Sequence, residues 1–135
     1  MQTVNDFFQH YSTAYVNNEL DAFEQLISLP SMLLSGDRKV LLVDRYSLRE
    51  HLLAQVTKYR QLGVVTADFV LQHQLRLSDQ LQFASLYRRF YDASAKIIFT
   101  CHTSYTLQYQ QDVWQVVAII LDDEQAAYNR AANRA

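Results

Sequence analysis

The stretch from Val64 to Asp122 constrains the fold most, because its apolar and polar residues alternate with a period of two. Polar turns interrupt the alternation at residues 78–80, 92–95 and 110–112. Alternation of this length, broken by short turns, is typical of antiparallel strands joined in sequence. The second half of the chain is therefore predicted to form four long antiparallel strands.

Two of these strands have a well-defined apolar face. In the first strand we expect the inward residues to be Phe69, Leu71, His73, Leu75 and Leu77. In the third strand the corresponding set is Ile97, Phe99, Cys101, Thr103, Tyr105 and Leu107. The second strand alternates ambiguously, so either Arg89 or Arg88 could be its inward arginine.

Helical periodicity dominates the N-terminal third of the chain. Apolar residues between Val4 and Tyr15 follow the i, i+3, i+4 rule of an amphipathic helix. A second, short helix is expected with Asn18 as its N-cap and Pro30 as its end, because the residue before a proline avoids helical angles. An Ala-rich helix from Glu124 to about Ala132 is predicted to close the chain. The buried stripe of the second helix comprises Leu20, Phe23, Leu26 and Ile27.

A small hairpin and a third helix are predicted between these regions. Ser31–Leu34 and Val40–Val43 have the composition of short strands around a turn at Gly36, whose glycine supplies any positive φ that the turn needs. The sequence Ser47–Glu50 fits a capping box at a helix start. Gly63 follows the last apolar position, where a left-handed C-terminal cap is usual.

Length and charge limit the classes of protein to which the chain belongs. Its 135 residues suit one domain, which we expect to span residues 1–135. The net charge is −2 and the basic residues are scattered, so nucleic acid is not an expected partner. No apolar run reaches the length of roughly 18 residues that a membrane span needs, and the first residues do not resemble a signal peptide. We therefore expect a cytoplasmic protein without a membrane partner.

Cysteine, histidine and glycine content argues against metals and cofactors. Cys101 is the single cysteine, and no two histidines have evident ligand spacing, so no metal site is expected. Only two glycines occur, at Gly36 and Gly63, which excludes a Gly-rich phosphate loop. No cofactor is therefore predicted.

The predicted order of elements resembles the nuclear transport factor 2-like (SnoaL-like) family, which includes the ketosteroid isomerases. Residues Phe8–Tyr11 followed by Asn18–Phe23 look like the family's opening, and Trp114–Val117 looks like its final strand. The resemblance implies an α+β, cone-shaped fold. In that fold a strongly curved antiparallel sheet of two short and four long strands wraps around three N-terminal helices, followed by a short C-terminal helix.

The resemblance also implies a pocket at the open end of the cone, suited to a small apolar or weakly anionic ligand. Its expected lining residues are Tyr11, Tyr15, Met32, Phe69, His73, Tyr87, Arg89, Tyr105 and Trp114. Within the resemblance, Tyr11 occupies the place of a tyrosine that donates to an oxyanion in ketosteroid isomerases. The carboxylates that those enzymes need have no counterpart in residues 31–35 or 101–105.

Two other titratable residues are candidates for acid–base chemistry. His73 interrupts an apolar face, where a neutral imidazole could act as a base, and Asp122 could pair with His73 or with Arg89. Each also has a structural interpretation as a satisfied polar residue. Three functions therefore stay open: a small-molecule-binding domain, an enzyme of the isomerase, dehydratase or cyclase kind, and a protein-association module.

The last predicted strand is apolar on both faces, which bears on assembly. The resemblance turns Trp114, Val116, Ala118, Ile120 and Asp122 inward. The opposite face is equally apolar, with Val113, Val117, Ile119 and Leu121. Two apolar faces on one strand need two covers. We therefore expect a homodimer that forms through the outer face of the sheet.

Overall fold

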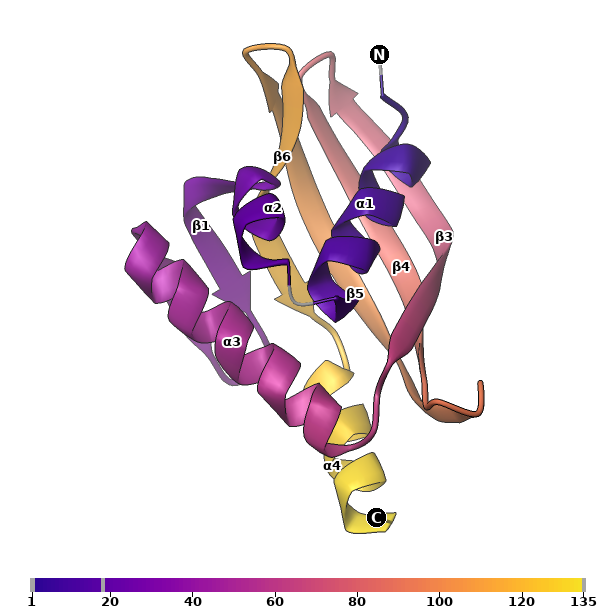
Figure 1. Cartoon of the computed structure of the whole chain (residues 1–135). Helices are drawn as coiled ribbons and strands as arrows, with labels where there is room; N and C mark the ends of the chain where they lie inside the picture. Colours follow the sequence, from indigo (N-terminus) through magenta and orange to yellow (C-terminus); the bar gives the residue numbers. More distant parts are fainter. Residues whose placement is uncertain (1, 18, 135) are drawn as a thin grey trace.

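The computed structural model describes residues 2–17 and 19–134, and it places four helices and six strands in those ranges (Figure 1). In chain order these elements are α1 (Val4–Val16), α2 (Leu20–Gln25), β1 (Ile27–Leu34), β2 (Lys39–Leu42), α3 (Arg45–Gln61), β3 (Thr66–Ser78), β4 (Leu81–Tyr91), β5 (Ile97–Gln110), β6 (Val113–Leu121) and α4 (Glu124–Arg134).

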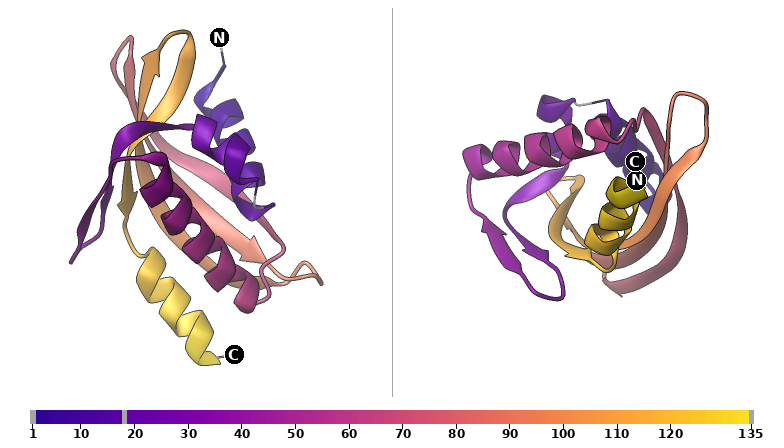
Figure 2. Two further views of the ribbon diagram at one scale, coloured as in Figure 1. Left: turned by 60° about the vertical axis from the view of Figure 1, so that its left-hand side comes forward. Right: turned by 90° about the horizontal axis from the view of Figure 1, so that it is seen from below.

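The strands form one sheet in the order β2-β1-β6-β5-β4-β3. The sheet is curved, and helices α1 and α3 lie over its concave side while α4 continues from β6 past its end (Figures 1 and 2). This arrangement confirms the predicted α+β cone. One detail of the prediction is wrong. The sheet was expected to be antiparallel throughout, but β1 runs parallel to β6. The other four strand pairs are antiparallel.

The boundary between α2 and β1 differs from the prediction. Helix α2 ends at Gln25, and Ile27 is already the first residue of β1. Pro30 therefore lies inside a strand, after a cis peptide bond, and does not end the helix. The pairing of β1 with β6 is interrupted between Ile27 and Met32, as expected where a proline has no N–H to donate. The predicted N-cap, Asn18, lies outside the described residues.

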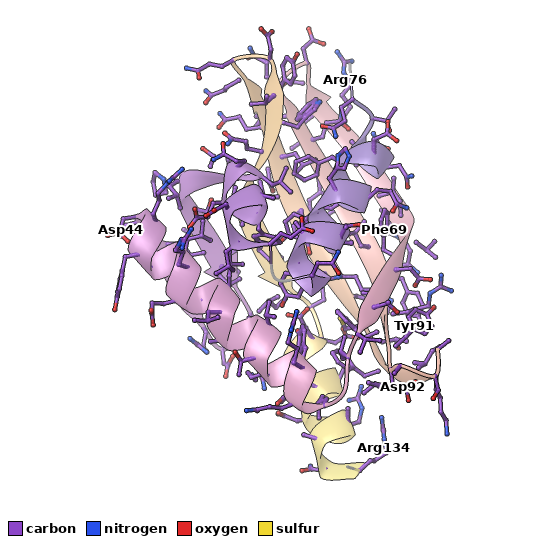
Figure 3. All side chains as sticks on the ribbon, in the orientation of Figure 1. Asp44, Phe69, Arg76, Tyr91, Asp92 and Arg134 are labelled. Atoms are coloured by element: carbon purple, nitrogen blue, oxygen red, sulfur yellow. The ribbon has the colours of Figure 1, made fainter. Side chains whose placement is uncertain are left out.

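Helix α3 begins three residues earlier than its sequence suggested. Its N-cap is Asp44 (Figure 3), and Ser47 in the first turn of the helix completes a capping box with it. The Ser47 amide donates to Asp44 Oδ1 at 2.8 Å, and the Asp44 amide donates to Ser47 Oγ at 3.2 Å. Gly63 has the predicted left-handed φ of 94°, whereas the turn at Gly36 forms without a positive φ at the glycine.

A β-bulge in β3 moves His73 to the outer face of the sheet. Leu71 pairs with Leu86 of β4, but the next pair joins His73 to Ser85, so Gln72 is an extra residue on β3. An extra residue reverses which face each later side chain occupies. The prediction that His73 points inward is therefore wrong, and its side chain is exposed.

A second bulge, in β6, corrects the predicted orientation of Asp122. Val116 pairs with Leu107 and Ala118 with Thr106, so Val117 has no partner in the register of β5. Beyond this bulge the inward residues are Ile119 and Leu121, and the outward residues are Ala118, Ile120 and Asp122. The alternation of β5 contains no such break alongside the core, and its predicted inward residues from Phe99 to Leu107 are buried.

Aromatic rings fill the space between α1 and the sheet. Phe8 and Tyr11 of α1 contact Tyr105 of β5, with ring centroids 4.8 and 5.2 Å apart. Tyr11 also lies 4.6 Å from the ring of Phe23 in α2. The core therefore extends from the helices to the sheet.

None of the helices in the described ranges is long and apolar enough to cross a bilayer.

Two neighbouring leucines of α3 test how the helix packs. Leu52 is 3% exposed and Leu53 is 47% exposed. We expect Leu52→Ala to lower the free energy of unfolding by about 2–5 kcal/mol, because the change leaves a cavity in the core. Leu53→Ala should change it by no more than about 0.5 kcal/mol. Urea denaturation of the two variants compares them directly, and equal losses would contradict the assigned face of α3.

Candidate functional site

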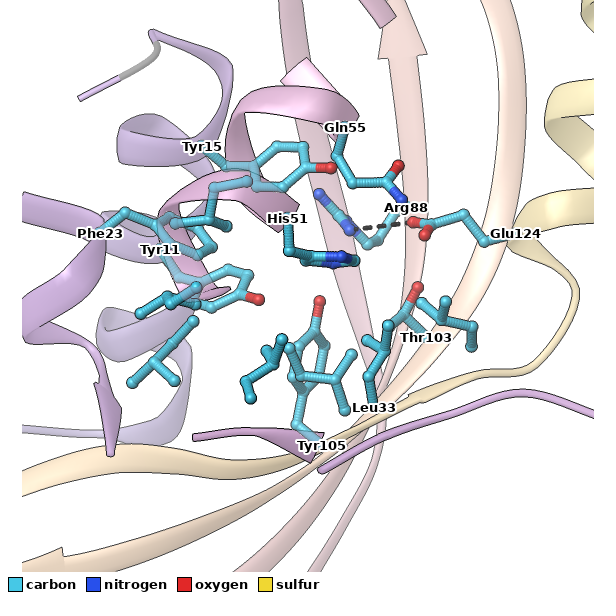
Figure 4. A pocket seen from close by; sticks show the side chains of 16 residues that line it. Tyr11, Tyr15, Phe23, Leu33, His51, Gln55, Arg88, Thr103, Tyr105 and Glu124 are labelled. Atoms are coloured by element: carbon cyan, nitrogen blue, oxygen red, sulfur yellow. Dashed lines mark hydrogen bonds and ion pairs between the residues drawn. The ribbon is translucent and has the colours of Figure 1, made fainter. Parts of the chain in front are cut away.

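A small cavity whose lining includes several polar side chains lies within the apolar core, between the helices and the concave face of the sheet (Figure 4). Its volume is about 20 Å³, which is room for about one water molecule. The cone is therefore nearly filled by its own side chains. The lining residues that carry polar groups are Tyr11, Tyr15, His51, Gln55, Arg88, Thr103, Tyr105 and Glu124.

The cavity contains a buried ion pair between β4 and α4. Arg88 is 3% exposed and Glu124 is 6% exposed. Arg88 Nη1 donates to Glu124 Oε1 at 3.3 Å, while Nη2 has no hydrogen-bond partner among the described residues. Burial opposes the charge of Arg88, but the neighbouring Tyr105 and Glu124 outweigh it and hold the pKa of Arg88 well above its ordinary value. The guanidinium is therefore a fixed positive charge in the core.

Aromatic rings surround this charge. The guanidinium carbon of Arg88 lies 5.1 Å from the ring centre of Tyr15 and 4.9 Å from that of Phe90, within cation–π range. Burial, followed by the neighbouring Glu124, raises the pKa of the Tyr15 hydroxyl. Burial also raises the pKa of Tyr105 to about 12. Both hydroxyls are thus neutral at pH 7 and can donate hydrogen bonds to a ligand.

Helix α3 contributes His51 and Gln55 to the rim of the cavity. Their positions differ by four in the sequence, so they lie on the same face of the helix, about one turn apart. Burial lowers the pKa of His51, and the positive charges of Arg38 and Lys58 lower it further. A neutral imidazole at pH 7 offers one donor and one acceptor to the cavity.

The structure brings together three of the residues predicted to line a pocket, namely Tyr11, Tyr15 and Tyr105. Three other predicted residues lie elsewhere in the fold. Phe69 of β3 (Figure 3) packs against Phe8 of α1, and Trp114 of β6 packs against Tyr109 of β5. Met32 pairs with Ala118 on the outer face, so Leu33 takes its place beside the cavity.

The remaining predicted residues lie on the outer face of the sheet. Arg89 holds Asp68 through two hydrogen bonds of 2.6 and 3.0 Å, and Arg88 is the inward arginine. Tyr87 lies beside His102 on the same outer face, with ring centroids 5.2 Å apart. The pocket positions predicted for Tyr87 and Arg89 are wrong, because the residues of β4 that face the core are Ala84, Leu86, Arg88 and Phe90.

His73 and Asp122 are also away from the cavity. His73 pairs with Ser85, whose hydroxyl lies 2.8 Å from that of Ser104. Ser104 in turn donates to Asp122 Oδ2 at 3.0 Å. These residues form a polar row across the outer face and do not approach Tyr11.

The sequence pattern does not single out Glu124, His51 or Gln55 as site residues. The cavity-facing residues of α3 sit next to its apolar stripe, at positions that a helical wheel assigns to the boundary. The ambiguous alternation of β4 allows Arg88 as its inward arginine. Glu124 gave only the signal of an acidic residue in the first turn of a helix, which is common at any helix start. The described ranges contain no group of three or more His, Cys, Asp or Glu side chains that could hold a metal ion.

A curved sheet with helices and a small cavity on its concave side defines a cone-shaped domain of the NTF2-like class. The family model described as "NTF2-like protein (DUF6841)" matches residues 2–124. The chain therefore belongs to this NTF2-like family. Among curated proteins, none matches the sequence significantly.

Solved structures of low sequence identity share the fold. Aln2 from a Streptomyces species has a TM-score of 0.73 at 13% identity, covering 94% of this chain and 92% of its own. An NTF-2 like protein of unknown function from Shewanella oneidensis has a TM-score of 0.67 at 16% identity, covering 87% and 93%. A ketosteroid isomerase-like protein from Erwinia carotovora atroseptica has a TM-score of 0.65 at 14% identity, covering 86% and 89%. At these identities the similarity establishes the fold alone.

The lowered pKa of His51 predicts a dependence of stability on pH. Below the ordinary histidine pKa of 6.5, the unfolded chain takes up a proton at His51 more readily than the folded protein does. Folding stability should therefore fall as the pH drops from 7.5 to 5.5. In His51→Gln this loss should be smaller, as measured by urea denaturation at both pH values. An equal loss in the variant would show that His51 is not the group responsible.

Proposed function

We propose that this protein binds a small molecule in the cavity of the cone. The observation that carries the proposal is the convergence of polar side chains from five elements on one point of an apolar core. Arg88 is the central group, because it is buried, charged and has an N–H group without a partner among the described residues. Keeping such a group in a core costs stability, which favours a role in binding.

Binding requires some side chains or an element to move. The cavity of about 20 Å³ is far smaller than the few hundred Å³ of a typical ligand site. The cavity is bordered by α3, through His51 and Gln55, and by the first residue of α4. A ligand that displaces part of this border gains access to Arg88 and to the tyrosine hydroxyls.

The lining offers both apolar and polar contacts to the proposed ligand. Phe23, Leu33, Leu48, Leu52 and Ile119 form apolar walls. Arg88, Glu124 and the tyrosine hydroxyls are polar groups that would fix the orientation of the ligand. An isomerase-like reaction with His73 or Asp122 beside Tyr11 has no support in this geometry, because the first two lie on the outer face.

Blocking the cavity rim should abolish binding. Gln55 lines the cavity, whereas Gln61 is exposed near the end of the same helix. We expect Gln55→Trp to lose any small molecule that native mass spectrometry detects on freshly purified protein, while Gln61→Trp retains it. A thermal-shift screen of small organic molecules extends the comparison. If no compound distinguishes the wild type and Gln61→Trp from Gln55→Trp, the proposal is wrong.

We also propose that two copies associate through the outer face of the sheet. Val70 and Leu75 of β3 are 45% and 58% exposed, and Phe83 and Ile120 lie on the same face, half-buried. Exposed apolar side chains that share one face are typical of an interface. The row from His73 to Asp122 would provide polar contacts within it.

Charge placed on the outer face should separate the copies. We expect the wild type to sediment as a dimer at micromolar concentration and Leu75→Glu to shift toward the monomer, because a buried unpaired carboxylate is costly. Leu53→Glu, on the exposed side of α3, is the matched control and should leave the dimer intact. A wild-type monomer at that concentration would overturn this proposal without affecting the cavity.

A further inference from the structure

We propose that Arg88 anchors a carboxylate group of the ligand, and that Glu124 holds the carboxylate position when the ligand is absent. This inference rests on the proposed function, since it assigns the chemical class of the molecule that enters the cavity. Glu124 lines the cavity and is the first residue of helix α4. In this proposal the ligand takes the place of Glu124 and displaces α4, which otherwise closes the cavity.

The contact between Arg88 and Glu124 leaves the guanidinium incompletely satisfied. It consists of one hydrogen bond of 3.3 Å, and Nη2 has no partner within the described ranges. The adjacent residue of the same strand shows the alternative: Arg89 grips both oxygens of Asp68, at 2.6 and 3.0 Å. A guanidinium matches a carboxylate best in this two-pronged form. Arg88 can therefore bind a free carboxylate better than it binds Glu124.

The charges that line the cavity select the class of ligand. In the described lining, Arg88 supplies the guanidinium and Glu124 the carboxyl group, and burial and nearby positive charges lower the pKa of His51. A ligand carboxylate that replaces Glu124 leaves Arg88 paired. A neutral ligand in the same place would strand the buried positive charge, and a cationic ligand would be repelled by it. The cavity therefore favours a molecule with a single carboxylate.

Helix α4 is held in place by few large side chains. Besides Glu124, its buried residues are Ala127 and Ala131, which contribute little apolar area. Tyr128 adds ring contacts to Tyr59 and Phe99 at 6.0 and 6.4 Å. The helix extends past the end of the sheet (Figure 2), and the family match ends at residue 124. Displacing α4 therefore leaves the six strands paired, and its local stability is expected to be low.

A chemical-rescue experiment tests the assignment. Glu124→Ala removes side-chain atoms that correspond to one acetate ion, and it leaves Arg88 without its counter-ion. We expect acetate to bind Glu124→Ala at least about tenfold more tightly than the wild type, a typical size for the linkage between two competing groups. The measurement is the melting temperature as a function of acetate concentration, with chloride holding the ionic strength constant. Acetamide, which has the same shape without the charge, should give no such response.

Two further variants complete the comparison. Gln125→Ala changes the next, exposed residue of α4 and should respond to acetate like the wild type. Combining Glu124→Ala with Arg88→Met should abolish the response. If acetate and acetamide act equally on Glu124→Ala, or if acetate does nothing, the carboxylate assignment is overturned. The proposed function would still stand in that case if a small molecule that binds the wild type fails to bind Gln55→Trp.

Amide hydrogen exchange of the wild-type protein tests the displacement of α4 even where Glu124→Ala does not fold. Saturating benzoate should speed exchange in residues 125–134, because its carboxylate takes the place of Glu124 and releases the helix. Benzamide has nearly the same shape and no charge, so it should leave this exchange unchanged. Unchanged or slower exchange with benzoate would overturn the role assigned to α4.

Discussion

Single-residue bulges at Gln72 in β3 and at Val117 in β6 determine which side chains of these two strands face the core. Each bulge adds a residue that the neighbouring strand does not match, which bends the strand and increases its twist. Each also exchanges the two faces of the strand for all residues that follow. The inward positions of Ile119 and Leu121 beside Tyr105 and Thr103 follow from the bulge in β6. The cavity wall is thus a product of local irregularity within a regular sheet.

The sequence was sufficient to predict the order of elements and the class of fold. Periods of 3.6 and of two residues are properties of continuous segments, and most of these segments appear where they were expected. Orientation was predictable only where the alternation runs unbroken alongside the core, as in β5. His73 and Asp122 were assigned to the wrong face because nothing in their neighbouring residues distinguishes a bulged strand from a straight one.

The candidate site was less predictable than the fold, since its residues come from elements far apart in sequence. Tyr11, Tyr15 and Tyr105 could be recognised as inward aromatic residues. The pairing of Arg88 with Glu124 joins β4 to α4, across 36 residues, and depends on how the end of the chain folds back. Several site residues also belong to the packed core. Tyr11 and Tyr105, for example, contact Phe8 as well as the cavity. Binding and stability are therefore coupled at these positions.

The parallel pairing of β1 with β6 has a consequence for synthesis of the chain. Ser31 donates a hydrogen bond to the carbonyl of Val116, a residue 85 positions later. The β1–β2 hairpin therefore cannot join the main sheet until β6 has left the ribosome. Contacts of such long sequence separation slow folding, because a large loop must close before they form. During translation the first two strands must wait with an unpaired edge until β6, which unites the two parts of the sheet, has emerged.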